Sequence, residues 1–137
     1  MELQKILEYR NSRNRFCNRL GITLTELAVG HARVVKTVTE EDLNPIGFAH
    51  GGVYFTMADT AAGSAMAAYG TRAVTLNAQY NYFRSAVVGD VLTATAREVK
   101  HGGTVCVFEV TITDQQDRTL GSGTFTFFDL KEPLELD

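Results

Sequence analysis

The sequence has only two cysteines, Cys17 and Cys106, and they lie far apart without a C-x-x-C unit. This scarcity excludes a disulfide framework and gives no zinc-binding pattern. Cys106 falls on the apolar side of an alternating stretch, where a small buried thiol is expected. The three histidines, His31, His50 and His101, are too few and too scattered for a metal site. We therefore expect neither a metal ion nor a bound cofactor.

The chain also lacks an excess of positive charge, because 13 lysines and arginines stand against 16 aspartates and glutamates. It has no bulk attraction for nucleic acid or for an anionic membrane surface. No apolar run approaches the roughly 20 residues of a membrane span, and the charged amino terminus lacks the apolar region of a secretory signal. We expect a cytoplasmic protein without a nucleic-acid or membrane partner.

The length of 137 residues suits a single domain, residues 1–137, with a core of its own. In the first twenty residues, apolar side chains recur at helical spacing, at Leu3, Ile6, Leu7, Phe16 and Leu20. Gly21 then provides a stop signal. Residues 1–20 are therefore predicted to form an N-terminal helical extension.

A longer helix is predicted over residues 52–69, because this segment is rich in alanine and apolar nearly all round. Gly70 follows in the position that suits a left-handed C-cap. Asp59, in the middle of the helix, is the only formally charged side chain from residue 43 to residue 71. A buried carboxylate without a partner is costly, and this helix offers no Lys or Arg. Asp59 is therefore expected to face a wet pocket and to act as general base or nucleophile.

After this helix the apolar pattern changes to a period of two, which indicates strands. One face of residues 74–82 carries Val74, Leu76, Ala78, Tyr80 and Tyr82. The other face carries Thr75, Asn77, Gln79 and Asn81. Similar alternation marks residues 90–97 and 104–113, a last strand ends in TFTFFDL, and a strand interrupted near Gly30 precedes the helix.

The predicted order is a strand, a long buried helix, and then strands joined by short turns, which favours an antiparallel meander. One sheet with one helix that is apolar all round implies that the sheet wraps the helix. We therefore predict an α+β protein with the hotdog fold, in which five to six antiparallel strands surround a long central helix. Part of the helix and an edge strand would stay uncovered in a monomer, so dimerisation is expected.

The tripeptide His-Gly-Gly occurs twice, at residues 50–52 and 101–103. The second copy separates two alternating strands and is explained as a hairpin turn. In the first copy, Gly51 and Gly52 leave amides open at a helix N-terminus, which suits an oxygen that becomes anionic during a reaction. Close backbone packing is the alternative explanation for these glycines. His50 is expected to cap the turn or to contact substrate, with capping preferred.

Gly52 and Asp59 are seven residues apart, which is about 10 Å along a helix axis and too far to address one reacting carbonyl. If two such helices pack antiparallel across a dimer, the glycine amides of one subunit face Asp59 of the other. The site would then lie at the subunit interface and occur twice per dimer.

Several short motifs follow one another in an order that resembles a known family. They are Asn44-Pro45-x-Gly47, His50-Gly51-Gly52, Asp59-Thr60, Thr75-x-Asn77 and Arg84. Over residues 20–128 the set resembles the hotdog-fold acyl-CoA thioesterases of the phenylacetic-acid-degradation (PaaI-like) type. The resemblance implies hydrolysis of a small aryl- or medium-chain acyl-CoA to the free acid and coenzyme A. It also implies a homodimer that assembles into a homotetramer.

The resemblance further implies roles for individual residues. The Gly51 amide would polarise the thioester carbonyl, and Asp59 of the partner subunit would activate water or attack directly. Asn44 would help to place substrate or water, and Thr75 would lie near the carboxylate. Substrate contacts would come from His50, Gly52, Asn77 and Arg84. Coenzyme A would enter only as part of the substrate.

Two alternatives remain open. Hydratases and dehydratases with this fold usually depend on a catalytic histidine, so a comparison of His50→Ala with Asp59→Asn would discriminate them. A non-catalytic acyl-CoA-binding protein would be stabilised by ligand without releasing free thiol. Seven apolar side chains could line an acyl pocket: Phe48, Tyr54, Phe55, Met57, Met66, Tyr80 and Tyr82. Aromatic and methionine residues at these spacings more often belong to the core.

Overall fold

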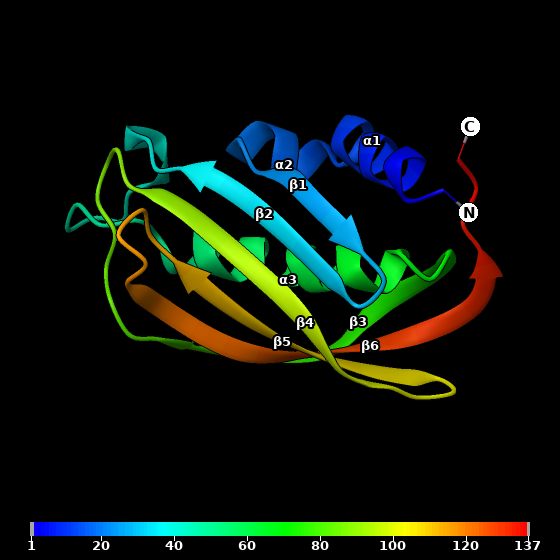
Figure 1. Ribbon diagram of the computed structural model, residues 1–137. Coiled ribbons are helices and arrows are strands. Elements are labelled where there is room, and N and C mark those ends of the chain that lie inside the picture. The colour runs from blue at the N-terminus through cyan, green and yellow to red at the C-terminus, as the bar shows by residue number, and fades with distance from the viewer. Residues whose placement is uncertain (1, 137) are drawn as a thin grey trace.

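The computed structural model describes residues 2–136 and consists of one curved sheet around a central helix (Figure 1). Its helices are α1 (Leu3–Arg13), α2 (Arg15–Leu20) and α3 (Gly51–Ala67), with a 3-10 turn η1 (Glu40–Asp42). Its strands are β1 (Thr23–Ala28), β2 (His31–Thr37), β3 (Thr71–Tyr82), β4 (Val91–His101), β5 (Val105–Thr113) and β6 (Thr119–Pro133).

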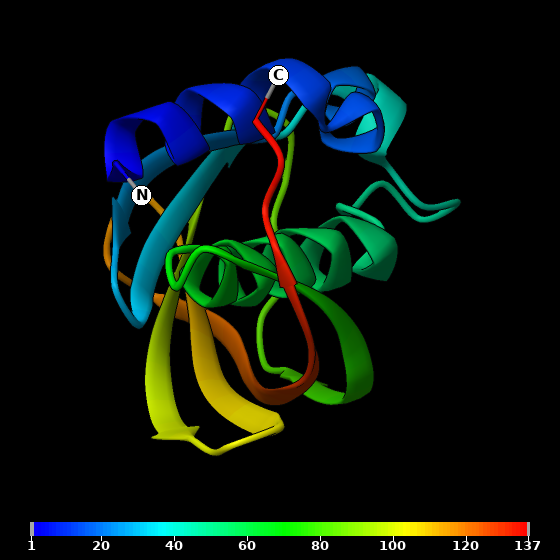
Figure 2. The same ribbon diagram turned by 90° about the vertical axis from the view of Figure 1, so that its right-hand side faces the viewer.

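All six strands form one antiparallel sheet in the order β1-β2-β4-β5-β6-β3. The sheet curls around α3, while α1 and α2 lie beside β1 and cover part of the remaining side (Figure 2). The predicted hotdog arrangement with an N-terminal helix is confirmed. No helix within residues 2–136 is long and apolar enough to cross a membrane.

The boundaries of the helices differ slightly from the prediction. The N-terminal extension is two helices, because the Asn14 side chain accepts a hydrogen bond from the Cys17 amide at 3.1 Å and starts α2. Gly21 ends α2, as predicted, and it adopts the left-handed conformation. The central helix α3 begins one residue earlier than predicted and ends two residues earlier.

The core lies between α3 and the concave face of the sheet. Its fully buried residues include Met57, Ala58, Ala61, Ala62, Ala65 and Met66 of α3. The predicted alternation holds in β4 and β5, where the fully buried side chains are Leu92, Ala94, Ala96, Cys106, Phe108, Val110 and Ile112. Small alanines on α3 let the strands approach closely, so this face of the helix is sealed against the sheet.

Strand β3 departs from the predicted alternation through a β-bulge. Thr75 pairs with Phe127 of β6, but the next pair is Asn77 with Thr126, so Leu76 is an extra residue. An extra residue of this kind shifts the period of two by one step. Side chains on either side of Leu76 therefore belong to different alternation patterns.

The bulge changes which side chains face the helix. Directly opposed residues of an antiparallel pair point to the same face. Thr75 shares the face of the buried Phe127 and points toward α3, whereas Val74 pairs with Phe128 on the outer face, where they are 51% and 38% exposed. The predicted faces are therefore right for residues 77–82 but wrong for Val74 and Thr75, and Leu76, predicted to share the face of Tyr80, is 58% exposed.

A buried ion pair anchors the loop that leads into α3. The Lys36 ammonium of β2 lies 2.8 Å from the Asp42 carboxylate of η1, and the two side chains are only 3% and 4% exposed. Lys36 also donates to the Leu20 carbonyl, and Asp42 accepts from the amide and hydroxyl of Thr39. The Asp42 carbonyl in turn accepts a hydrogen bond from the His50 amide at 2.8 Å. The pair thus ties β2 and α2 to the start of α3.

Candidate active site

The N-terminus of α3 is capped by His50. The His50 Nδ1 atom accepts a hydrogen bond from the Gly52 amide at 2.8 Å, and the His50 carbonyl accepts from Val53. The preferred capping role of His50 is therefore confirmed, and the Gly52 amide is already engaged. Among residues 2–136, the Gly51 amide forms no hydrogen bond. The Gly51 N–H is thus the backbone donor at this helix end that is free to bind a ligand.

A cluster of tyrosines holds Gly51 in place. The Tyr82 hydroxyl donates to the Gly51 carbonyl at 3.3 Å, and a Cβ atom added to Gly51 would lie 3.4 Å from the Tyr82 ring. Tyr82 packs in turn against Tyr54 and Tyr80, with ring centroids 5.7 Å and 4.7 Å away. Sequence reasoning treated these rings as acyl-pocket or core candidates, and it missed their contact with the helix N-terminus.

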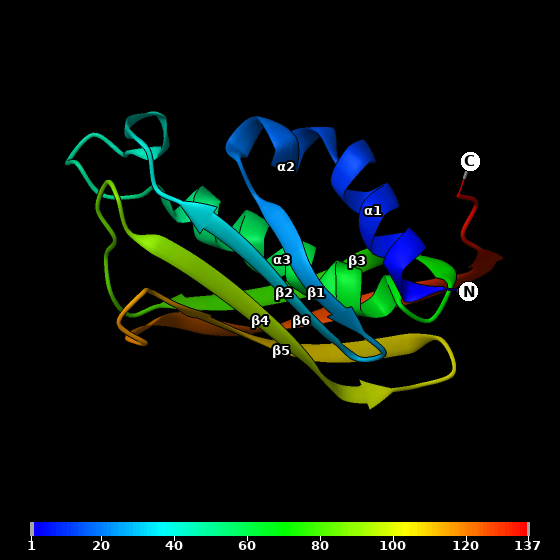
Figure 3. The same ribbon diagram turned by 45° about the horizontal axis from the view of Figure 1, so that its top comes forward.

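The loop before α3 is shaped by Asn44. Its Oδ1 atom accepts hydrogen bonds from the amides of Ile46 and Phe48, at 3.0 and 3.1 Å. The loop also packs against the connection between β3 and β4, where the Ala49 amide donates to Ala86 at 2.9 Å (Figure 3). Asn44 therefore shapes the approach to the helix N-terminus through its side-chain oxygen, and its amide nitrogen forms no hydrogen bond within residues 2–136.

Asp59 and Thr75 meet on the uncovered side of α3. The Thr75 hydroxyl donates to the Asp59 carboxylate at 2.7 Å, and Asp59 is only half-buried. This contact depends on the bulge at Leu76, because unbroken alternation would turn Thr75 to the outer face of the sheet. The carboxylate is thus accessible, and one of its oxygen atoms is oriented by a hydrogen bond.

A positive charge reaches α3 from the N-terminal extension. The Arg10 Nε atom of α1 donates to the Ser64 hydroxyl at 3.0 Å. Burial lowers the pKa of Arg10, and the negative charge of Asp59 opposes that shift. Sequence reasoning found no cation for Asp59 within α3. It missed Arg10 because 49 residues separate the two positions and the first twenty residues carry several arginines.

Within residues 2–136, neither Asn77 nor Arg84 forms a hydrogen bond or ion pair with Asp59. Asn77 pairs with Thr126 on the outer face of the edge strand, so it points away from α3 of its own subunit. Arg84 has an exposed side chain, and its carbonyl accepts a hydrogen bond from Tyr54 at 3.4 Å. The second His-Gly-Gly copy turns from β4 to β5, as predicted, with Gly102 donating to Val105.

The surroundings of the site show where a ligand has room and whether a metal ion could be held. A cavity of about 280 Å³ adjoins the N-terminus of α3 and is lined by Phe16, Leu20, Glu41, Asp42, Leu43, His50, Gly52, Val53 and Thr56. Within residues 2–136, no group of three or more His, Cys, Asp or Glu side chains could hold a metal ion. Of the acyl-pocket candidates, Met57 and Met66 are fully buried core residues, whereas Phe55 and Tyr82 are accessible.

Known proteins are similar to this chain in both sequence and fold. Residues 46–120 match the thioesterase superfamily. The acyl-coenzyme A thioesterase PaaI of Escherichia coli K12 is 37% identical over 101 residues, which are 74% of this chain and 72% of that protein. The solved structure of E. coli PaaI, from the phenylacetic acid degradation operon, covers 96% of this chain and 98% of its own, with 28% identity and a TM-score of 0.86. A hypothetical thioesterase of Streptococcus pneumoniae TIGR4, solved with coenzyme A, covers 82% and 88% at 34% identity and a TM-score of 0.79.

Proposed function

Because the chain belongs to the thioesterase superfamily and is a PaaI-like acyl-CoA thioesterase with the hotdog fold, we propose that it hydrolyses small aryl- or medium-chain acyl-CoA at a site shared by two subunits. The whole chain, residues 1–137, acts as one thioesterase domain in a cytoplasmic homodimer that pairs into a homotetramer. The reaction uses neither a metal nor a bound cofactor, since coenzyme A is part of the substrate.

The separation of two half-sites on α3 is the observation that carries this proposal. Asp59 with Thr75 forms one half, and the Gly51 amide forms the other. Eight residues of helix separate them by about 12 Å, so one subunit does not bring both to the same carbonyl. An antiparallel pair of α3 helices would bring the Gly51 amide of one subunit to Asp59 of its partner.

Uncovered apolar surface supports such pairing. The edge strand β3 leaves Val74 and Leu76 exposed, and the segment that follows leaves Phe83 exposed. Along α3, the less buried stripe consists of Gly51, Gly52, Phe55, Thr56, Asp59, Thr60 and Gly63. An unpaired edge strand beside exposed apolar side chains favours association with a second copy. Pairing would cover both features and enclose Asp59.

The chemistry follows from the two half-sites. The Gly51 N–H donates to the carbonyl oxygen of the thioester and stabilises the negative charge that develops there. Asp59 either takes a proton from the water that attacks the carbonyl carbon, or attacks that carbon itself and is released by water. The carbon–sulfur bond then breaks, and the coenzyme A sulfur leaves and is protonated to the thiol. Thr75 keeps the carboxylate in position throughout.

The substrate proposal draws on the relatives. The pneumococcal structure holds coenzyme A, which favours an acyl-CoA here. The E. coli protein comes from the phenylacetic acid degradation operon, so phenylacetyl-CoA is the first acyl-CoA to test.

Release of free thiol from a panel of aryl and straight-chain acyl-CoA thioesters tests the proposal. Thermal stabilisation by acyl-CoA without thiol release would instead identify a binding protein.

The contact between Thr75 and Asp59 predicts the effect of its removal. Thr75→Val deletes the hydroxyl that donates to the carboxylate, so kcat should fall about tenfold, as for the loss of one hydrogen bond to a charged group. Thr75→Ser keeps the hydroxyl and should stay within a few-fold of the wild type. Steady-state thiol release measures both variants, and equal rates for Val and Ser would contradict the assigned contact.

A further inference from the structure

The charge of Asp59 has no counterpart on its own helix. It is the only formally charged side chain from residue 43 to residue 71. A carboxylate that loses water when substrate covers it tends to take up a proton, and an opposite charge nearby counteracts that tendency. If Asp59 stays ionised in the substrate complex, the opposing charge must come from another element.

The geometry of Arg10 meets this requirement. Its Nε atom donates to the Ser64 hydroxyl at 3.0 Å, and Ser64 donates to the Thr60 carbonyl at 2.6 Å. A Cβ atom added to Gly63 would lie 3.6 Å from the Arg10 Nη2 atom. Gly63 follows Asp59 by four residues and therefore lies on the same helix face, one turn further on. The guanidinium is thus held against the turn that adjoins Asp59.

Among residues 2–136, the other groups that interact with Asp59 are neutral. Thr75 of β3 contributes a hydroxyl. Cys17 of α2 contacts the Thr60 hydroxyl at 3.2 Å, and burial raises the pKa of its thiol, which stays protonated at neutral pH. Arg10 is therefore the cation among the groups shown to interact with Asp59.

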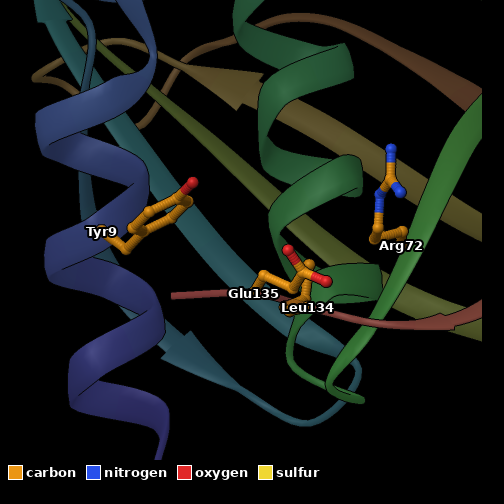
Figure 4. A pocket seen from close by; sticks show the side chains of 4 residues that line it. All are labelled: Tyr9, Arg72, Leu134 and Glu135. Atoms are coloured by element: carbon orange, nitrogen blue, oxygen red, sulfur yellow. The ribbon is translucent and has the colours of Figure 1, made fainter. Parts of the chain in front are cut away.

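A second arginine in the same region is engaged elsewhere. A cavity of about 170 Å³ is lined by Arg10, Gly63, Ala67, Thr71, Arg72, Ala73 and Leu134. It adjoins a wider cleft in which Tyr9 of α1 faces the C-terminal segment, with Arg72 on the far side (Figure 4). Arg72 is exposed and lies 3.5 Å from Glu132. An exposed, paired charge is well screened, so Arg10 has the stronger influence on the carboxylate.

We propose that Arg10 is a positioning residue for catalysis, whose guanidinium, anchored to α3 through Ser64, keeps Asp59 ionised while acyl-CoA covers it. The N-terminal extension thereby supplies the charge that the central helix lacks. The inference rests on the proposed function, because it matters only if Asp59 is the catalytic carboxylate.

The test is the pH dependence of kcat in variants of Arg10. In Arg10→Met, the acidic limb of the kcat profile should move to higher pH by about one unit, while the rate at high pH stays near that of the wild type. Arg10→Lys should restore the wild-type limb because it keeps the charge. Arg10→Gln loses the charge but keeps an N–H donor for Ser64. The acidic limb of its kcat profile should therefore shift to higher pH as in Arg10→Met, and this variant provides the test even if Arg10→Met folds poorly.

A second charge on α1 provides the control for the loss of the Arg10 charge. Lys5→Met removes the same charge from an exposed position on α1 and should leave the profile unchanged. A loss of kcat that is equal at every pH, or an unshifted limb in Arg10→Gln, would overturn the role of Arg10. Absence of thiol release by the wild type is a separate result, and it would reject the proposed function itself.

Discussion

Replacement of Asp59 by asparagine is expected to lower kcat for acyl-CoA hydrolysis at least about a hundredfold. Asparagine has nearly the same shape, and its side-chain oxygen can still accept the hydrogen bond from Thr75. It can neither take a proton from water nor attack the thioester. The loss therefore measures the chemical contribution of the carboxylate in a folded protein, by release of free thiol from the best substrate of the panel.

Two comparisons make this result specific. Asp117→Asn changes the same atoms in the exposed turn between β5 and β6, at a positive φ that asparagine tolerates, and should leave kcat unchanged. His50→Ala removes the cap of α3 and should have a smaller effect than Asp59→Asn. If His50→Ala abolished turnover while Asp59→Asn did not, histidine-dependent chemistry would replace the proposed mechanism.

Replacement of Lys36 by methionine is expected to lower the free energy of unfolding by about 3–5 kcal/mol. The change leaves the Asp42 carboxylate buried with only the amide and hydroxyl of Thr39 as donors. A loss of this size is a large fraction of the stability of a single domain and should lower Tm on the order of 10 °C. Denaturant unfolding and thermal melts measure it. Arg97→Met, which breaks an exposed pair with Glu109, should cost less than about 1 kcal/mol.

Acid provides a second readout of the same ion pair. Burial alone would raise the pKa of Asp42, but hydrogen bonds from Lys36 and Thr39 outweigh burial and hold the pKa below its ordinary value. Such a group stabilises the fold above its unfolded-state pKa near 4, and this stabilisation is lost as the pH falls through the lower folded-state value. The wild type should therefore lose stability in this acidic range more steeply than Lys36→Met. Parallel curves for the two proteins would contradict the assigned role of the pair.

Local sequence patterns were sufficient for the main elements of the fold. The apolar alanine-rich run predicted α3 to within two residues, and the period of two predicted the buried faces of β4 and β5. These features depend on neighbours in the chain, which a pattern records directly. The capping role preferred for His50 also follows from local chemistry, since its ring nitrogen reaches the amide two residues on.

The bulge in β3 and the contact of Arg10 depend on tertiary structure. Residues 75–77 contain no glycine or proline to signal a bulge, and Leu76 is recognisable as the extra residue only from its register with β6. Alternation alone placed Thr75 on the wrong face, so its proximity to Asp59 came from the family resemblance and not from the pattern. Arg10 lies against the turn of α3 that follows Asp59 only because α1 packs over α3, and no periodicity in the sequence predicts that packing.

Complementation between inactive subunits tests the shared active site most directly. Gly51→Pro removes the N–H at the first position of α3, where proline is tolerated, and Asp59→Asn disables the other half-site. In a heterodimer of the two variants, the intact Gly51 of one subunit would face the intact Asp59 of its partner. After subunit exchange in equal amounts, we expect about a quarter of the wild-type activity, because half of the dimers are mixed and each has one intact site. Mixtures that exchange subunits but stay as inactive as either parent would contradict an active site built from two subunits.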